Sequence, residues 1–314
     1  MTFAPRRHGR FLDLPAIACL AVAAMTSPPA AASPVELQLQ RANSGHVLLP
    51  VTIDGDGPFT FLLDTGATHT AIAAPLAEQF GFVSAWALYG DVQALTTRFE
   101  AERFALEDVR LAGQDPMDLV SVVIPVEEGQ PIPVSGLLGA DAIAASRYDI
   151  DFGAGRLTLD AHPARHADGQ VADSGLLIGT AGLRRGVHRI HVMLDSGSAR
   201  TLVNRRLQRQ VSNRTMVVRM GGTGSRIGGI DGNEQEEARP VILRHLQIGG
   251  LCIPAVAALE ADLDIFRALG WEHQPAMVIG MDVLQHARVR VDRETGTYEI
   301  DASAASDALA CERG

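Results

Sequence analysis

Two aspartates in this chain share the same sequence surroundings and are of the residue type that acid–base chemistry needs. Asp64 ends an apolar stretch and begins the tripeptide Asp-Thr-Gly, and Asp195 ends a second apolar stretch and begins Asp-Ser-Gly. Two carboxyl groups that lie close together cannot both be ionised cheaply, so they share one proton. The ionised group can take a proton from water as a general base, while the protonated group polarises a carbonyl. Such a pair titrates as a unit, so these two roles stay unassigned between the two residues.

The residues after each aspartate have physical reasons to be small or hydroxylated. Gly66 and Gly197 allow a tight turn that brings backbone N–H groups to the carboxylates without an intervening Cβ. The two copies differ at the next position, which is Ala67 in the first and Ser198 in the second. The Ser198 hydroxyl can hydrogen-bond Asp195 and favour its ionised form, which an alanine cannot do. We therefore expect an uneven pair with an acidic to mildly acidic pH optimum.

The pattern of apolar residues predicts short β-strands separated by turns. Apolar and polar residues alternate over 35–40, and segments 46–53 and 59–63 are also strand-like. Residues 148–160 alternate around a Gly-Ala-Gly turn, which is typical of a β-hairpin. A short helix closed by glycine is expected over 75–81. The chain is thus predicted to be all-β with few short helices.

The second half of the chain repeats features of the first half in the same order. The two aspartates are 195 − 64 = 131 residues apart. The pattern Leu-x-x-apolar-x-apolar-x-Gly occurs at 106–113 and at 243–250, an offset of 243 − 106 = 137. Residues 139–160 match residues 280–301 without a gap, at an offset of 280 − 139 = 141. Chance similarity between hairpins would rarely preserve this order, so the chain is interpreted as a tandem duplication.

An apolar strand followed by Asp-Thr-Gly or Asp-Ser-Gly, found twice in one chain, resembles the aspartic peptidases of the pepsin and retropepsin clan. The resemblance implies two pseudo-symmetric β-barrel lobes that each deliver one aspartate to a cleft between them. It implies an endopeptidase that cleaves peptides or unfolded proteins with water activated between Asp64 and Asp195, without a cofactor. The copy with Ala67 is retropepsin-like and the copy with Ser198 is pepsin-like. The chain therefore resembles two fused bacterial retropepsin-like lobes that complete the site as a monomer.

The same resemblance assigns supporting roles to other segments. Thr65 and Ser196 would cross-bond the two aspartate loops through their hydroxyl groups. Residues 137–139 and 278–280 would pass beneath these loops and pack them from below. Members of this clan also close a hairpin flap over the substrate. The candidates for that flap are Leu88–Val92 and Met220–Gly229.

The alternative function is a non-catalytic protein on the same scaffold, whose cleft binds a peptide or a cell-wall fragment. Fold alone does not imply function, so the site must decide between the two. Both acids and both following glycines are present, which favours the enzyme. A lobe that had lost its chemistry would be expected to have lost one of them.

The N-terminus and one short polar segment define the expected domain boundaries. Arg6 and Arg7 precede an apolar run, and three alanines at 30–32 fit a small-residue cleavage site. Because the apolar run is too short for a permanent membrane span, we expect a signal peptide and export to the periplasm or beyond. The expected parts are a signal peptide at 1–32, an N-terminal lobe at 33–161, a linker at 162–172, a C-terminal lobe at 173–302 and a tail at 303–314.

Composition and missing motifs argue against several other functions. The net charge of −10 argues against a nucleic-acid partner. The chain has no Gly-x-Ser-x-Gly, His-Glu-x-x-His, Walker loop or Cys-x-x-Cys, so no metal or other cofactor is expected. His162 and His166 are four residues apart, but Pro163 argues against a metal-binding helix there. In an exported protein Cys252 and Cys311 could form a disulfide, although a small buried thiol at Cys252 is the alternative.

Overall fold

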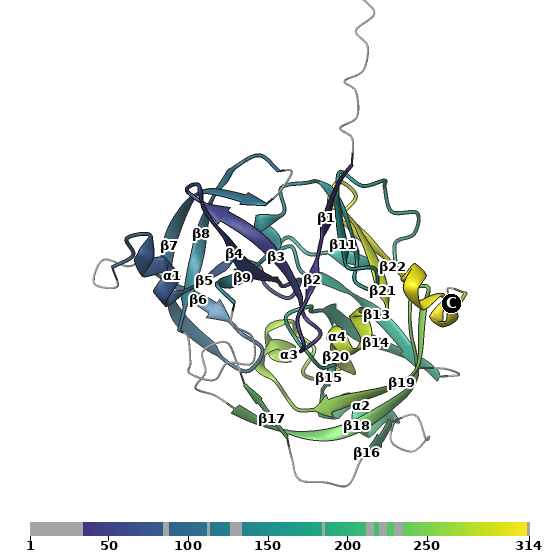
Figure 1. The fold of residues 1–314 in the computed structure, drawn as a ribbon. Helices are drawn as coiled ribbons and strands as arrows, with labels where there is room; N and C mark the ends of the chain where they lie inside the picture. The colour runs from purple at the N-terminus through teal and green to yellow at the C-terminus, as the bar shows by residue number, and fades with distance from the viewer. Residues whose placement is uncertain are drawn as a thin grey trace, which may run out of the picture. The chain divides into compact units, whose positions relative to one another are not determined.

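The computed structural model describes residues 34–83, 88–111, 114–125, 134–183, 186–211, 217–219, 225–228 and 235–312. The expected signal peptide at 1–32 lies outside these described residues. So do residues 220–224 and 229 of the second flap candidate. Within the described ranges the chain is mostly β-strand with few short helices, as the apolar pattern predicted (Figure 1).

Six strands of the first half close into a barrel. Each strand is hydrogen-bonded to the next, and the last is bonded to the first. The second and third strands are parallel, as are the fourth and fifth, and every other pairing is antiparallel. In this order the strands are β3 (Val47–Ile53), β4 (Asp56–Leu63), β9 (Gly136–Leu138), β5 (Ala71–Ala73), β8 (Met117–Ile124) and β7 (Arg98–Leu111).

Six strands of the second half close into a barrel with the same order of parallel and antiparallel neighbours. In the same sequence they are β13 (Leu177–Leu183), β14 (Gly186–Leu194), β20 (Ala276–Ile279), β15 (Leu202–Val203), β19 (Leu251–Glu260) and β18 (Gln235–Ile248). Even a rare backbone feature recurs. Asp108 in β7 and His245 in β18 are 245 − 108 = 137 residues apart, and both have left-handed φ angles, of 46° and 55°.

Six consecutive antiparallel strands of a larger sheet, which continues into the second barrel, join the two halves of the chain. Three of these strands come from the first half and three from the second, and β10 pairs with β21 at the junction. Ion pairs cross this junction, where Arg147 contacts Asp292 at 3.2 Å and Arg288 contacts Asp149 at 2.6 Å. In order the strands are β1 (Val35–Gln38), β11 (Arg156–Leu159), β10 (Arg147–Asp151), β21 (Ala287–Asp292), β22 (Thr297–Ala302) and β12 (Gly169–Val171). The expected linker at 162–172 therefore contains a strand, β12, which pairs with β22.

The remaining elements are short and lie at the edges and ends of these sheets. The helix expected over 75–81 is present as α1 and is followed by Gly81 with a left-handed φ of 88°. In the part of the chain that the structure describes, no helix is long and apolar enough to cross a membrane. The remaining strands and helices are β2 (Gln40–Arg41), β6 (Leu88–Gln93), β16 (Val217–Arg219), β17 (Ser225–Gly228), α1 (Ala74–Gln79), α2 (Arg205–Val211), α3 (Asp264–Ala268), α4 (Met281–Leu284), η2 (Ala140–Ala142) and η4 (Ala304–Leu309).

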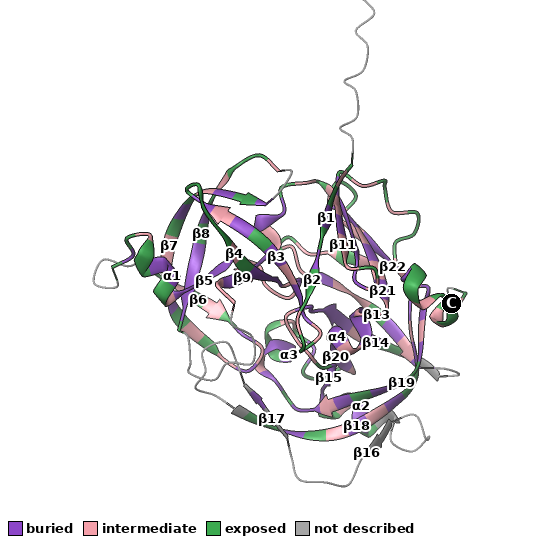
Figure 2. Cartoon of the chain, in the orientation of Figure 1, coloured by how far each residue is buried: buried purple, intermediate pink, exposed green. Residues whose placement is uncertain are grey.

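The longer outer strands of the barrels bury mainly one face, which is the physical reason for the alternation in the sequence, whereas the short strands β5, β15 and β20 are buried throughout (Figure 2). In β3 the side chains of Val47, Leu49, Val51 and Ile53 are buried, while those between them are partly or fully exposed. The strands that lead into the two aspartates are buried more completely at their ends. This makes the end of each such strand a rigid support for the residue that follows it.

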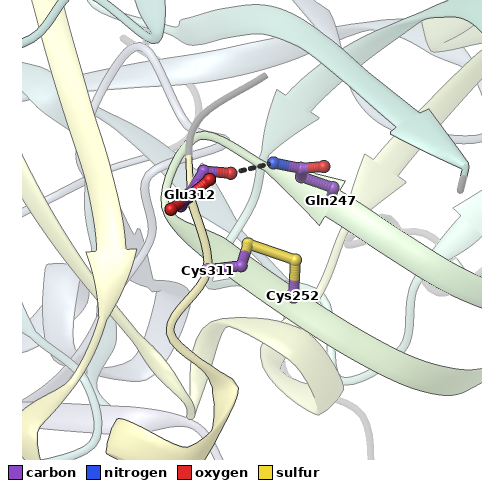
Figure 3. The surroundings of a disulfide bond; sticks show 4 residues. All are labelled: Gln247, Cys252, Cys311 and Glu312. Carbon is purple, nitrogen blue, oxygen red and sulfur yellow. Dashed lines mark hydrogen bonds between the residues drawn. A yellow bond between two sulfur atoms is a disulfide. The ribbon is translucent and has the colours of Figure 1, made fainter.

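A disulfide fixes the C-terminal segment to the second barrel (Figure 3). It joins Cys252 in β19 to Cys311 after η4, with the two Cα atoms 5.8 Å apart. The side-chain amide of Gln247 also donates a hydrogen bond to the carbonyl of Glu312 at 2.6 Å. Of the two states that the sequence left open for Cys252, the structure has the disulfide.

Candidate active site

Each of the two aspartates directly follows a central barrel strand. The backbone N–H of Asp64, after β4, donates to the carbonyl of Leu138 in β9 at 2.9 Å. The backbone N–H of Asp195, after β14, donates in the same way to the carbonyl of Ile279 in β20 at 2.9 Å. In both barrels the neighbouring parallel strand thus passes beside the aspartate and fixes the position of its backbone.

A second carboxylate in each barrel ties down the end of the aspartate loop. Asp141 accepts hydrogen bonds from the backbone N–H of Thr70 at 2.8 Å and from its hydroxyl at 2.7 Å. Asp282 accepts from the N–H and hydroxyl of Thr201 at 2.9 and 2.7 Å. These carboxylates lie in the first turn of η2 and of α4, so each loop is fixed at both of its ends. The sequence comparison of the two halves paired Asp141 with Asp282 but did not predict this role.

The two aspartate loops are bonded to each other through Thr65 and Ser196. The N–H of each residue donates to the hydroxyl of the other, at 3.0 Å in both directions. The Thr65 hydroxyl donates to the carbonyl of Leu194 at 3.0 Å, and the Ser196 hydroxyl donates to that of Leu63 at 2.7 Å. Both residues are buried, so these four bonds are shielded from competition with water. This is the cross-bonding that the resemblance implied.

The two glycines allow the carboxyl groups to approach each other. A Cβ added to Gly66 would lie 2.5 Å from Cγ of Asp195, and one added to Gly197 would lie 2.4 Å from Oδ2 of Asp64. Each glycine therefore packs against the carboxyl group of the other barrel, where no side chain fits. The N–H of each glycine donates to the aspartate of its own loop, at 2.9 Å for Gly66 and 2.8 Å for Gly197.

Burial raises the pKa of both carboxyl groups, and their contact raises the pKa of Asp195 while it lowers that of Asp64. Burial is the largest cause at both residues, and Asp195 is only 3% exposed. The pKa of Asp195 is raised well above its ordinary value, because the charge of Asp64 adds to the effect of burial. Each of the two carboxyl groups also shifts the pKa of the other. The pair is therefore suited to hold a single proton over a range of pH in which isolated aspartates are ionised.

The expected bond between the Ser198 hydroxyl and Asp195 is absent, and this corrects the sequence analysis. The hydroxyl instead donates to the carbonyl of Arg200 at 2.8 Å, within its own loop. It is the backbone N–H of Ser198 that donates to Oδ1 of Asp195, at 3.1 Å. Because an alanine has the same N–H, the choice of serine at this position does not by itself make the pair uneven.

A cleft of about 370 Å³ opens above the two carboxyl groups. Its apolar wall is formed by Ala71, Val122 and Leu137 of the first barrel, and Met193 and Ile265 of the second half also line it. The cleft is therefore large enough for side chains of a bound chain, with an apolar surface next to two acids.

The hairpin formed by β6 and β7 covers one side of this cleft. Asp91 and Val92 of the first flap candidate line the cleft, and so does Leu95 at the tip of the hairpin. The carbonyl of Leu95 accepts a hydrogen bond at 3.1 Å from the N–H of Ile265, in α3 of the second half. The hairpin thus reaches from the first barrel to a helix beyond it. Of the second flap candidate, 225–228 form β17, which pairs with β18.

One residue in contact with the site was not singled out from the sequence. His46 precedes β3, is 7% exposed, and has its ring Nε2 3.0 Å from the carbonyl oxygen of Gly197. Its position at the start of an apolar strand carries no signal of such a role, because the contact depends on how the two barrels meet. His69, which is close to Asp64 in sequence, does line the cleft.

One comparison with known proteins indicates which class of protein has a site of this kind. Residues 49–142 match the model of a family described as aspartyl protease. The matched range begins within β3, contains Asp64 and ends in η2, so it spans the strands of the first barrel. This part of the chain is therefore similar to aspartyl proteases, which are hydrolases of peptide bonds. No curated protein sequence matches the chain.

Proposed function

We propose that the protein is an exported aspartic endopeptidase that hydrolyses peptide bonds with water activated between Asp64 and Asp195. The observation that carries this proposal is the pairing of a buried carboxyl group, Asp195, with a partly exposed one, Asp64, delivered by matching loops to the floor of one cleft. The similarity of residues 49–142 to aspartyl proteases supports it. Thr65, Ser196 and the two loop glycines then act by holding the acids in contact.

The chemistry follows from one proton shared by the pair. The ionised carboxylate takes a proton from the attacking water, and the protonated carboxyl donates to the oxygen of the scissile carbonyl. The tetrahedral species that results collapses when the first carboxyl group gives the proton it took from water to the amide nitrogen, which leaves as an amine. One hydroxyl of that species returns its proton to the second carboxylate, so the pair again holds one proton. No covalent bond to the enzyme forms at any step. The raised pKa of Asp195 is what keeps the necessary proton on the pair at mildly acidic pH.

The origin and assembly of the site are part of this proposal. The identical neighbour order of the two barrels supports a tandem duplication of one ancestral lobe. Each barrel supplies one acid, so one chain holds both members of the pair and can act as a monomer. A peptide or an unfolded protein is the substrate, because the cleft is open to a chain segment and the acids lie at its floor.

Export is proposed from the N-terminal residues and from the cysteines. Residues 1–32 have the order of a signal peptide, with arginines, an apolar run and small residues. The disulfide between Cys252 and Cys311 supports an oxidising compartment such as the periplasm or the exterior, because disulfides persist there.

The test is turnover of a quenched fluorescent peptide library between about pH 3 and 7. The proposal predicts cleavage that a pepstatin-like inhibitor blocks and that Asp195→Asn abolishes, while the variant keeps the wild-type circular dichroism spectrum. If the wild-type protein binds library peptides but cleaves none, it is a binding protein on this scaffold and the proposal fails. Cleavage that persists in the variant would also contradict it.

A further inference from the structure

His46 links the first barrel to the catalytic loop of the second. Its ring makes two contacts, one at 3.0 Å from Nε2 to the carbonyl of Gly197 and one at 2.8 Å from Nδ1 to the hydroxyl of Ser44. Gly197 packs directly against the carboxyl group of Asp64. A buried side chain at this point therefore affects the position of the Gly197 loop, and through it the contact of this loop with Asp64.

The two contacts fix the tautomer of the neutral ring. A carbonyl oxygen only accepts hydrogen bonds, so Nε2 must carry the hydrogen and Nδ1 must accept from the Ser44 hydroxyl. When the ring takes a second proton, Nδ1 becomes a donor, and the same hydroxyl oxygen can accept from it. His46 can thus gain a positive charge without losing its bond to Gly197. Most other buried side chains could not change charge at so little structural cost.

The second barrel has no histidine at the corresponding place. Leu48 pairs with Leu62 across β3 and β4, and Ile178 pairs with Met193 across β13 and β14. Leu62 and Met193 both stand two residues before a catalytic aspartate, so Leu48 corresponds to Ile178. His46 stands two residues before Leu48, and Leu176 stands two residues before Ile178. His46 therefore corresponds to a leucine, Leu176. The place in the second barrel that corresponds to His46 thus has no titratable side chain.

The charged groups around the ring are few. The pKa of His46 is lowered, because burial outweighs both the Gly197 carbonyl and the charge of Asp64, which raise it. In return, a protonated His46 lowers the pKa of Asp64. Asp195 accepts a hydrogen bond from the N–H of Gly197 at 2.8 Å. Arg41, on the segment before His46, donates to the Gly45 carbonyl at 3.3 Å.

We propose that His46 is a positioning residue that holds the Gly197 loop in its neutral form and, once protonated, extends activity to lower pH. This inference rests on the proposed function of Asp64 and Asp195. Below the pH at which the ring gains its proton, the imidazolium stabilises the single negative charge of the acid pair. The pair then keeps its catalytic, singly protonated state in a more acidic solution than two aspartates alone would.

The kinetic test compares pH profiles of kcat/KM for the wild type, His46→Gln and His46→Leu. In both variants the acid limb of the kcat/KM profile is expected to move to higher pH by about one unit, while the alkaline limb stays where it is in the wild type. His46→Gln should keep a higher maximal kcat than His46→Leu, because its amide can still donate to Gly197. His286→Gln is the matched control, since His286 also contacts a serine hydroxyl, at 3.1 Å to Ser306. Unchanged acid limbs in both His46 variants would overturn the inference.

A second measurement separates this inference from the proposed function. The titration of the His46 ring is followed by NMR in the wild type and in Asp64→Asn. The midpoint should fall in Asp64→Asn, because the negative charge that favours the protonated ring is gone. An unchanged midpoint overturns the inference whether or not the protein cleaves peptides. If the wild type is inactive on every peptide, the proposed function fails and the NMR result alone decides whether His46 and Asp64 are coupled.

Discussion

Thr65 and Ser196 each donate a backbone N–H to the hydroxyl of the other at 3.0 Å, across 131 residues of sequence. Their hydroxyl hydrogens are directed in turn to the carbonyls that precede the two aspartates, those of Leu194 and Leu63. The backbone on either side of each acid is therefore bonded to the opposite barrel. The distance between the two carboxyl groups is therefore determined by these cross-bonds as well as by the two barrels.

Removal of either hydroxyl should cost both stability and activity. Thr65→Val or Ser196→Ala leaves a buried N–H and a buried carbonyl without a partner, which costs about 1–3 kcal/mol. We expect a lower melting temperature and a kcat reduced by at least tenfold, with a small effect on KM. The double variant should cost less than the sum of the single ones, because the two hydroxyls serve the same contact. Additive losses in thermal unfolding would contradict this account.

A methyl group at either loop glycine should separate the acids. In Gly197→Ala the new Cβ would overlap Oδ2 of Asp64, so that carboxyl group or the loop must shift. Activity should fall by more than a hundredfold, because misplaced catalytic groups lose rate steeply. Gly182→Ala in β13 is the matched control, since a Cβ there meets nothing within 4 Å. Retention of wild-type turnover by Gly197→Ala would show that the described contact is not required.

The two acids, their glycines and the hydroxyl residues between them could be predicted from sequence, because a short motif with strict spacing carries them twice. The strands could be predicted as well, since alternation of apolar residues reports burial of one strand face, whereas the barrels were implied by the resemblance. Asp141 and Asp282 were found as a repeated pair, but their bonds to Thr70 and Thr201 needed the fold. A local sequence pattern thus identifies the residues of the site better than it identifies their hydrogen-bond partners.

Contacts that depend on the detailed fold were outside the reach of the sequence. The Ser198 hydroxyl was expected at Asp195, yet the nearer carbonyl of Arg200 takes it, because a flexible hydroxyl bonds to the best-placed acceptor. His46 touches Gly197 only because the two barrels meet there. The disulfide was left open for the same reason, since 59 residues separate its two cysteines in sequence.

The raised pKa of Asp195 predicts how stability should depend on pH. The folded protein keeps a proton that the unfolded chain releases once the pH exceeds the ordinary value of 3.8. Unfolding therefore releases a proton, so the contribution of Asp195 to stability falls as the pH rises through its raised pKa. Asp195→Asn cannot lose this proton. Its melting temperature should exceed that of the wild type by more at pH 7 than at pH 4, whereas an equal difference at both would contradict the raised pKa.

Arg103 in β7 places a positive charge in the wall of the cleft. Its guanidinium donates to the Asp91 carbonyl at 3.1 Å and lies against Gly90, where a Cβ would be 2.8 Å from Nε. Peptides with glutamate near the scissile bond should be cleaved up to about fivefold faster than matched lysine peptides, since a partly exposed pair contributes up to about 1 kcal/mol. Arg103→Glu should reverse this preference at pH 6.

The control for this prediction is Arg110→Gln, on the same strand. Arg110 is exposed and its guanidinium contacts Asp108 at 2.7 Å, outside the residues that line the cleft. It should leave the preference between glutamate and lysine peptides unchanged. An identical preference in the wild type and Arg103→Glu would show that this arginine does not contact substrate.

The central claim is that Asp64 and Asp195 act as one unit, and the most direct measurement is kcat/KM for Asp64→Asn, Asp195→Asn and the double variant. Either single substitution removes the shared proton chemistry, so each should reduce kcat/KM nearly as much as both together. Circular dichroism spectra of the three variants serve as the check that each of them folds. Turnover at the wild-type level in either single variant, or losses that simply multiply in the double variant, would contradict the account.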